Sequence, residues 1–406
     1  MLYVGIDVAK DKHDCHVMRD GGEVVVDNYT FENSREGFRL FRELVENARR
    51  RKEEVKFGLE YTGHYSRNLL EYLREARCDV IPLNPLKVNL YRKSRSLRNT
   101  KTDKTDARYI AEVTAKTVPE PRRYVSQAMR ALKSLTRYRY RLQKTVQITK
   151  NRYRRVLQLV FPEFEKHFNV NYRSAIELIG RYSSPKEIMI ADRERLVYNL
   201  DRLSHGRYGK RADELIQAAE ESIGVSNPGD AYELKRLSKL VAFLENEVAL
   251  AEEKMRAILE KVDSPILTIP GVGVSTGATI LAEIGNIKNF SSDAKLLAFV
   301  GGEPTIYQSG KFVLQHGAMV KKGSRYLRNA LFQATKAAYI VDPVMRAYVD
   351  KKRAEGKHFF VALSHGMKKM TRIIFSVLRS GKPYEAPPTP EQKENTVPTE
   401  GTVISS

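Results

Sequence analysis

The short apolar run YVGIDVAK, from Tyr3 to Lys10, constrains the fold of this chain more than any other stretch. It is rich in Tyr, Val and Ile and too short for a convincing helix, so it predicts a β-strand. The run delivers one carboxylate, Asp7, at its end. Because a sheet holds its strands stiffly and brings distant residues together, we expect Asp7 to organise a site.

Three further carboxylates are expected at the ends of other elements. Glu60 ends the apolar run EVKFGLE, and Asp103 and Asp106 lie three apart where a helix should begin. At that spacing both aspartates face one side of the first helical turn. Alone, they would be interpreted as helix caps, but the presence of Asp7 and Glu60 favours a functional site. Carboxylate oxygens are the ligands that Mg²⁺ or Mn²⁺ prefers, so these four residues predict a metal site.

Composition and charge restrict the class of protein. A chain of 406 residues is expected to form two or three domains. Its 70 Lys+Arg against 49 Asp+Glu give a net charge of +21, which favours a nucleic-acid partner over a membrane. No stretch predicts a membrane span or a signal peptide, so we expect a cytoplasmic protein. The two cysteines, Cys15 and Cys78, predict neither a disulfide framework nor a zinc site.

The order of predicted elements indicates an α/β fold at the N-terminus. Three strands come first, the second and third joined at a turn over residues 20–22, and a helix begins at Ser34. The strand VKFGLE, a helix over about residues 64–77 and the strand CDVIPLN follow. This βββαβαβ order is that of the ribonuclease H-like (RuvC-like) fold, whose members hold two divalent ions with strand-end and helix carboxylates.

An acid-free segment follows, over residues 121–162, and predicts one long basic helix interleaved with tyrosines. A charged helix face normally mixes signs to form ion pairs, and this segment has no acids of its own to pair with. We therefore predict that it binds phosphates. The residues predicted to do so are Arg122, Arg123, Arg130, Lys133, Arg137, Arg141, Lys144, Lys150 and Arg154.

A heptad pattern runs from Leu237 to Val262, with apolar residues at alternating steps of four and three, and predicts a coiled-coil helix. Its partner could be the basic helix of the same chain or a second subunit; the short length favours the same chain. The pattern assigns no task to residues 163–230.

The segment ILTIPGVGVSTGATILAEIG resembles a helix-hairpin-helix, in which turn amides can hold a phosphate. A glycine-rich turn between two packed helices explains the same pattern equally well. An Arg-rich helix is expected from Ser324, and the segment past Lys382 is expected to be disordered. The predicted nucleic-acid contacts in this part of the chain are Gly271, Gly273, Lys311, Lys321, Lys322 and Arg325.

As an ordered set, several stretches resemble the DEDD-type insertion-sequence transposases, which join a RuvC-like N-terminal domain to a mainly helical transposase domain with a catalytic serine. The likeness spans nearly the whole chain apart from its tail and is carried by GIDVAKDKHDCHV, GLEYTGHY, LNPLKV, TDKTDARYIA, IPGVGVSTGATILAEIG, LLAFVGGEPTIYQSGK and KKGSRYLRNALFQA. The expected domains are a RuvC-like domain (1–118), a basic helical and coiled-coil region (119–262), a transposase domain (263–382) and a disordered tail (383–406).

The resemblance implies specific roles. By motif position the four acids that bind Mg²⁺ are Asp7, Glu60, Asp103 and Asp106, and the serine is Ser309. It also implies recombination of target and donor DNA under direction of a structured bridge RNA, a homo-oligomer, and a bacterial or archaeal protein associated with the nucleoid. From the residues alone, Ser275 or Ser324 would compete with Ser309.

Three other functions fit part of the pattern. A metal-dependent, Holliday-junction-type endonuclease would use the four acids and water, without a serine. A non-catalytic RNA-binding protein would explain the cations but not the four acids at element ends. An actin-like sugar kinase would need further glycine-rich phosphate loops, which the sequence lacks.

Overall fold

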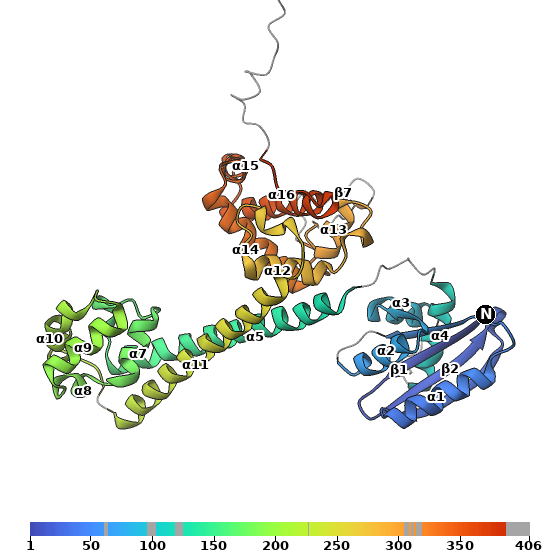
Figure 1. Ribbon diagram of the computed structural model, residues 1–406, viewed down its shortest axis with the longest axis horizontal. Coiled ribbons are helices and arrows are strands. Elements are labelled where there is room, and N and C mark those ends of the chain that lie inside the picture. Colours follow the sequence, from blue (N-terminus) through green and yellow to red (C-terminus); the bar gives the residue numbers. More distant parts are fainter. Residues whose placement is uncertain are drawn as a thin grey trace, which may run out of the picture. The chain divides into compact units, whose positions relative to one another are not determined.

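The computed structural model describes residues 1–60, 64–95, 103–117, 125–225, 227–303, 308–309, 312–313 and 319–386. At residues 103, 308–309 and 312–313 it describes only the backbone. The chain divides into two compact units, Met1–Arg122 and Arg123–Ser406, which are described separately (Figure 1). No helix in the described ranges is long and apolar enough to cross a lipid bilayer.

The N-terminal unit is built on a five-stranded mixed sheet with the order β3-β2-β1-β4-β5. Its strands are β1 (Leu2–Val8), β2 (Lys12–Arg19), β3 (Val24–Glu32), β4 (Val55–Glu60) and β5 (Asp79–Leu83). The β1-β2 and β2-β3 pairs are antiparallel, and the β1-β4 and β4-β5 pairs are parallel. The α/β fold predicted for this part of the chain agrees with this sheet.

Helices cover both faces of the sheet. Buried side chains of α1 (Arg35–Ala48) and α2 (Ser66–Glu75) pack with Val4, Ile6 and Cys15 on one face. On the opposite face lie α3 (Pro85–Arg95) and α4 (Asp103–Lys116), where Ala111 packs with Tyr3. Because side chains alternate along a strand, Asp7 belongs to the same face as Tyr3, the face covered by α4.

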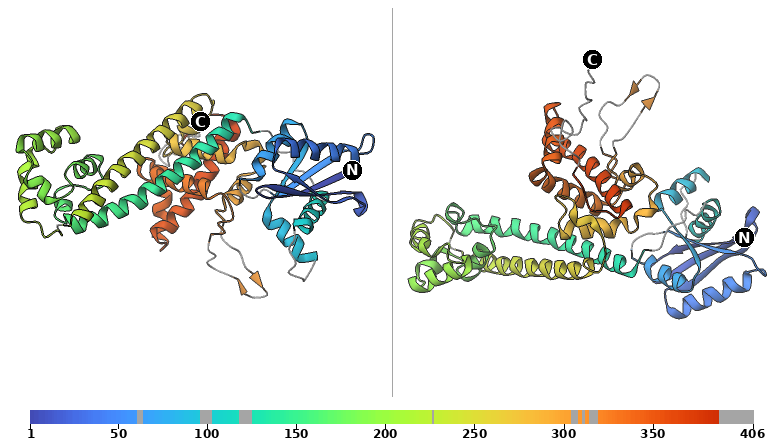
Figure 2. Two further views of the ribbon diagram at one scale, coloured as in Figure 1. Left: turned by 90° about the horizontal axis from the view of Figure 1, so that it is seen from below. Right: turned by 45° about the horizontal axis from the view of Figure 1, so that its top comes forward.

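The second unit is organised along two long helices, α5 (Gln127–Val160) and α11 (Pro228–Leu259), which run antiparallel beside each other (Figure 2). Residues 127–160 of the acid-free segment therefore form one long helix, as predicted. Most of the heptad seam of α11 is buried or half-buried, including Val241, Ala251 and Met255. The partner of α11 within the chain is α5, as the sequence favoured.

Residues between the two long helices form a small helical insert (Figure 1). It comprises α6 (Phe164–His167), α7 (Arg173–Arg181), α8 (Pro185–Met189), α9 (Arg193–Ser204), the 3-10 turn η2 (Gly209–Arg211) and α10 (Ala212–Glu220). The insert shares one apolar core with the adjoining ends of the long helices, containing Phe164, Ile176, Leu196, Leu215 and Val241.

The C-terminal part packs on the other end of the long-helix pair. It comprises η3 (Pro265–Thr268), α12 (Val274–Ile284), η4 (Ile287–Asn289), α13 (Asp293–Val300), the short strands β6 (Gln308–Ser309) and β7 (Phe312–Val313), α14 (Arg325–Val341), α15 (Pro343–Ala354) and α16 (Phe359–Ser380). A second core joins Leu132 of α5 to Met255, Leu281, Leu331 and Met370.

The predicted helix-hairpin-helix differs in its first half. The element before the glycine turn is the single 3-10 turn η3, capped by Ser264, and not a helix. Pro265 starts this turn, and Pro270 disfavours helical backbone in the residue before it, so there is no room for a longer helix.

Of the expected disordered tail, residues 387–406 lie outside the described part of the chain.

Candidate active site and nucleic-acid interface

Asp7 and Glu60 lie beside each other at the ends of two neighbouring strands. The parallel register of β1 and β4 pairs Gly5 with Gly58 and Ile6 with Leu59. Asp7 and Glu60 are the next residues of these two strands. Both acids share a face of the sheet with the glycines, because side chains alternate along a strand. That is the face on which α4 lies.

Two glycines let α4 approach the sheet more closely than any other residue would allow. A Cβ at Gly5 would lie 2.2 Å from the backbone oxygen of Ala107 and 2.2 Å from the backbone nitrogen of Ala111. A Cβ at Gly58 would lie 1.7 Å from Oγ1 of Thr114. The backbone of α4 therefore packs directly on the backbone of β1 at Gly5, and the Thr114 side chain packs directly on the backbone of β4 at Gly58.

Helix α4 crosses the face of the sheet on which the two strand-end acids lie. Ala107 and Ala111 lie over Gly5 of β1, and Thr114 lies over Gly58 of β4. Lys104, in the first turn of α4, pairs with Asp27 of β3. The structure thereby places Asp7 and Glu60 near the ends of paired strands and Asp106 on the helix that covers the same face.

Asp106 is only 7% exposed, and its Oδ1 accepts a hydrogen bond of 3.2 Å from Nη1 of Arg92 on α3. Arg92 also donates to Asn89 at 2.9 Å, which fixes the guanidinium in place. Asp103 is the first residue of α4, and its side chain lies outside the described residues. Within the described side chains, no three His, Cys, Asp or Glu residues are grouped closely enough to hold a metal ion.

The sequence interpretation missed one acid at this place. Asp14 on β2 is the antiparallel partner of Asp7 and is 7% exposed. Thr30 on β3 donates a hydrogen bond of 2.5 Å to its Oδ1. The signal was present in the strand KHDCHVMR, where alternation places Asp14 and His16 on one face and His13 and Cys15 on the other.

Of the three candidate serines, two have hydrogen-bonding roles within the fold. Ser275 donates to Oε1 of Glu252 at 3.1 Å. Ser324 caps α14 by accepting from the Leu327 amide, and it donates to Oε2 of Glu283 at 2.9 Å. Ser309 ends the short strand β6, and its side chain lies outside the described residues, as does Lys311.

The basic helix α5 finds acids on other elements, which corrects the argument that it has none to pair with. Arg137 binds Glu283 of α12 through two hydrogen bonds of 2.6 and 3.0 Å, and Lys133 lies 3.7 Å from the same carboxylate. Lys150 pairs with Glu245 of α11 at 2.6 Å. These three cations hold helices together, whereas Arg141 and Lys144 are exposed. Arg122 and Arg123 lie outside the described residues.

Glu283 is the most enclosed acid of this junction, at 2% exposure. Burial alone would raise the pKa of its carboxyl group. The hydrogen bond from Arg137, the charges of Lys133 and Arg137 and the hydrogen bond from Ser324 outweigh burial, so the pKa is lowered. Glu283 thus fastens α12 to α5 and to the start of α14.

Beside this carboxylate the cations gather around tyrosine rings. The guanidiniums of Arg137 and Arg325 lie 4.7 and 5.0 Å from the ring centre of Tyr326. Tyr140 meets Tyr326 edge to face at 5.0 Å, and Lys144 lies 5.7 Å from the Tyr140 ring. The hydrogen bond from Arg325, with the neighbouring positive charges, lowers the pKa of Tyr326. Cations alternating with aromatic rings are typical of nucleic-acid-binding surfaces.

The remaining predicted phosphate contacts occupy different environments. A Cβ at Gly271 would lie 2.4 Å from the Ala338 amide nitrogen, and its φ is +82°, so this glycine is required for packing on α14. Gly273 is the exposed N-cap of α12, with nothing near its Cβ position. Lys321, Lys322 and Arg325 are exposed before and at the start of α14. Arg130 is half-buried, and Arg154 donates to Asn171.

Sequence comparisons agree with this division of the chain. A DEDD-type IS110 transposase family model matches residues 4–162, and a model described as transposase, IS116/IS110/IS902 family, matches residues 263–350. The first match contains the sheet, α4 and α5, and the second contains α12, α14 and Ser309. Residues 163–262 belong to neither match.

Three curated proteins are similar over almost their whole length. An uncharacterized IS110 insertion-element protein of Streptomyces coelicolor is 30% identical over 405 residues, covering 95% of this chain and 96% of that protein. The pilin gene-inverting protein of Moraxella bovis is 24% identical, with 94% and 97% covered. A mini-circle putative transposase for IS117, also from Streptomyces coelicolor, is 24% identical, with 95% of each chain covered.

Proposed function

Because the chain belongs to the IS116/IS110/IS902 family of transposases, we propose that it cuts and rejoins DNA strands through a covalent phosphoserine intermediate at Ser309. Membership of the family implies cleavage of DNA and transfer of strands. The nucleophilic serine, the divalent metal ion and the guide RNA are parts of the proposal that go beyond family membership. The observation that supports it is that Asp7 and Glu60 follow paired residues of β1 and β4 on the face of the sheet that α4 covers.

The acids fit a hard divalent ion by their chemistry, since Asp7, Glu60, Asp103 and Asp106 offer only carboxylate oxygens. An Mg²⁺ or Mn²⁺ ion held by these residues would neutralise charge that develops on the phosphorus oxygens and the leaving oxygen. Arg92 keeps Asp106 oriented through the hydrogen bond to Oδ1. Asp14, adjacent to Asp7, adds negative charge on the same face.

Ser309 supplies the nucleophile in this proposal. Its Oγ forms a bond to phosphorus, the bond from phosphorus to the leaving sugar oxygen breaks, and the serine proton ends on that sugar hydroxyl. The phosphoserine ester preserves the bond energy, so the hydroxyl of another strand can attack it and restore the serine. Hydrolysis by water would lose that energy. Lys311 adds positive charge close to the serine in sequence.

The nucleic-acid partners follow from the same resemblance and from the cations. We propose that a structured guide RNA pairs with target and donor DNA and that the chain acts as a homo-oligomer. The exposed Arg141, Lys144, Lys321, Lys322 and Arg325 would contact phosphates. Lys133, Arg137 and Lys150 contribute mainly by holding the helices that present them.

The test is a strand-cleavage assay with Mg²⁺, RNA transcribed from the flank of the element, and end-labelled DNA, resolved under denaturing conditions with and without protease. Wild type is compared with Ser309→Ala, Asp7→Asn and, as a matched serine control, the exposed Ser291→Ala. We expect a protein-linked DNA band that protease removes. It should be absent in Ser309→Ala and Asp7→Asn and unchanged in Ser291→Ala.

Each other outcome identifies a rival. Free nicked ends that persist in Ser309→Ala would mean that water is the nucleophile, as in a junction endonuclease. RNA binding without any cleavage product in wild type would mean a non-catalytic RNA-binding protein. A covalent band that remains in Ser309→Ala but disappears in another serine variant would move the nucleophile to that serine.

A further inference from the structure

The helical insert carries an open groove of about 610 Å³. It lies between α7, α9 and the turn that follows α9, and its walls include Tyr172, Arg173, Glu177, Arg202, His205 and Arg207. The groove falls in residues 163–262, which neither family match contains. Its volume is in the range of sites that hold small organic groups.

The turn that forms one wall is fixed by its own hydrogen bonds. Oγ of Ser204 accepts from the amides of Arg207 and Tyr208 at 3.1 and 2.9 Å. The Asp201 carboxylate accepts from the Gly209 amide at 2.8 Å. His205 adopts the left-handed conformation with φ of 55°, which turns the chain sharply after α9. The positions of His205 and Arg207 are therefore set by the fold before any ligand arrives.

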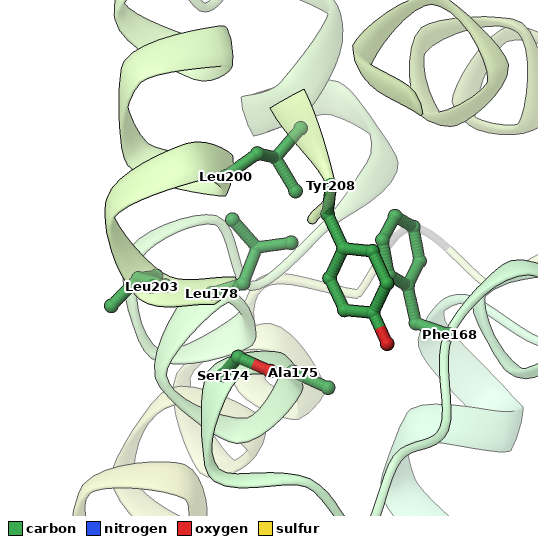
Figure 3. Close-up of a pocket in the computed structure, with 7 residues that line it drawn as sticks. All are labelled: Phe168, Ser174, Ala175, Leu178, Leu200, Leu203 and Tyr208. Atoms are coloured by element: carbon green, nitrogen blue, oxygen red, sulfur yellow. The ribbon is translucent and has the colours of Figure 1, made fainter. Parts of the chain in front are cut away.

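A closely packed apolar hollow adjoins the groove and shares Leu203 and Tyr208 with it. Figure 3 shows Leu178 and Leu200 directed toward the ring of Tyr208, which stands beside Phe168. The two rings meet edge to face with their centres 5.3 Å apart. The hollow between these side chains has no room for a water molecule, so the Tyr208 ring is packed firmly against its apolar neighbours.

The rim of the groove carries positive charge that the fold does not neutralise. Arg202 and Arg207 are exposed, and neither forms an ion pair with another described residue. The acid on this rim, Glu177, is already paired with Arg173 at 2.7 Å. Guanidinium groups match phosphate oxygens through paired hydrogen bonds, so the rim fits a phosphate-bearing ligand.

The groove adjoins the basic helix. Lys150 of α5 donates to the backbone oxygen of Asn171 at 3.3 Å, and Arg154 donates to the Asn171 side chain. The next residue, Tyr172, is 54% exposed at the groove. A chain of phosphates that follows α5 would thus reach Tyr172 and then Arg202 and Arg207.

We propose that this groove binds a single-stranded segment of nucleic acid, with phosphates on Arg202 and Arg207 and a base stacked on Tyr172. The proposal rests on the nucleic-acid-binding function proposed above. An open groove with cations and an exposed aromatic ring is the arrangement that binds single strands. A duplex hides the faces of its bases and would leave the tyrosine unused.

The experiment uses the full chain and a fluorescent oligothymidylate, an oligouridylate and a DNA duplex, with affinity measured between about 50 and 200 mM salt. Arg202→Gln with Arg207→Gln should lower the slope of log Kd against log salt by about 1.4, since each single-strand phosphate contact contributes about 0.7. Tyr172→Leu should weaken binding about tenfold at unchanged slope. Lys186→Gln with Arg195→Gln removes equal charge from exposed residues of the same insert and should change neither quantity.

Photocrosslinking with iodinated pyrimidines, followed by peptide mapping, locates the bound strand, and we expect adducts on Tyr172 or Tyr208. Wild type that binds single strands, with no adduct in residues 168–208 and no change in the Arg202 and Arg207 double variant, would overturn this inference alone. An equal loss of duplex binding in that variant would overturn the single-strand assignment. Failure of wild type to bind any of the three probes would overturn the proposed function as well. A thermal unfolding curve like that of wild type confirms that each variant is folded.

Discussion

Helices α4 and α12 are held in their units by opposite means. α4 lies on the sheet through close packing of its backbone on Gly5 and of its Thr114 side chain on Gly58. The ion pair that joins α4 to β3, Lys104 with Asp27, is exposed. α12 is fastened between α5 and α14 by a buried carboxylate, Glu283, which binds Arg137, Lys133 and Ser324. At both junctions an acid lies beside an arginine. Asp106 is in the first turn of α4, whereas Glu283 is near the end of α12 and is surrounded by packed helices.

The difference separates two uses of a buried acid. Where close packing on glycines holds the helix, Asp106 is not needed for that purpose, and its Oδ1 accepts from Arg92 of α3. Where an acid holds the helices, its oxygens are occupied by internal donors, as in Glu283. Low exposure alone therefore does not identify a functional acid, since both residues are buried.

The largest effect should come from Gly5→Ala, which tests whether close packing seats α4. The added Cβ would lie 2.2 Å from two backbone atoms of α4, so the helix must move away from the sheet. We expect a loss of about 3 kcal/mol or more in the free energy of unfolding of the N-terminal unit. Cleavage activity should be lost with it. Hydrogen exchange of peptides from β1 and α4 measures the effect.

Gly229→Ala is the matched control, because Gly229 lies in the first turn of α11 and its Cβ would approach only the Asn227 side chain, at 3.3 Å. It should be neutral or stabilising by a few tenths of a kcal/mol, as expected for alanine in an exposed helix. Fast exchange in α4 after Gly5→Ala, with none after Gly229→Ala, would support the packing argument. Unchanged exchange in both would contradict it.

Asp106→Asn tests whether the acid of α4 serves activity and not stability. Asparagine keeps an oxygen that can accept from Arg92, so the loss of stability should stay below about 1 kcal/mol. The loss of charge should reduce formation of the protein-linked DNA product at least about 100-fold, because even outer-shell changes at metal sites cost 10–100-fold. Asp79→Asn, an exposed residue at the start of β5, is the control and should retain activity. Equal activity of the two variants would refute the assignment of Asp106.

Glu283→Gln should reverse that pattern, with stability lost and chemistry retained. Removing one partner from a fully buried ion pair costs about 3–5 kcal/mol. Here the Arg137 and Lys133 side chains are 38% and 39% exposed, so water can solvate them, and we expect about 2 kcal/mol. Below the unfolding temperature, the protein-linked product should still form. Glu252→Gln removes a more exposed acid, which pairs with Arg139, and should cost less than about 1 kcal/mol.

The same acid predicts a dependence on pH. Partners lower the pKa of Glu283 in the folded chain against the effect of burial, so its stabilisation is complete above the unfolded value of about 4.3 and is lost as pH falls through the folded pKa. The difference in melting temperature between wild type and Glu283→Gln should be constant near neutral pH and shrink below about pH 4. A difference that grows on acidification would show that Glu283 is not held as the carboxylate.

Much of the N-terminal unit could be predicted because its signals are local. Alternation and turn residues indicated the strands, and the strand YVGIDVAK located Asp7 next to the end of β1. Periodicity likewise indicated α5 and the buried seam of α11. The placement of α4 was not predicted, because its cause is a contact between Gly5 and residues about a hundred positions later in the chain.

The roles of individual cations could not be predicted from the sequence either. Arg137 and Glu283 are 146 residues apart, so no local pattern shows that they pair. The absence of acids within residues 121–162 suggested free cations, whereas acids on α11 and α12 pair with four of the described ones. Asp14 was missed for a related reason, since its closeness to Asp7 depends on strand register. Ser309 was indicated only by resemblance.

The smallest expected effect is that of Ser324→Ala, which sharpens the account of the α12 junction. Loss of the cap of α14 should cost about 1 kcal/mol, and the lost hydrogen bond to Glu283 adds to this. Ser292→Ala removes the cap of α13, which has no described contact with Glu283, and should cost about as much as a cap alone. Combining each with Glu283→Gln separates the two contributions in unfolding measurements. Residues that share a hydrogen bond should be non-additive by at least about 0.5 kcal/mol, whereas the Ser292 pair should be additive. Additivity in both pairs would mean that Ser324 acts only as a cap and that Glu283 is held by Arg137 and Lys133 without it.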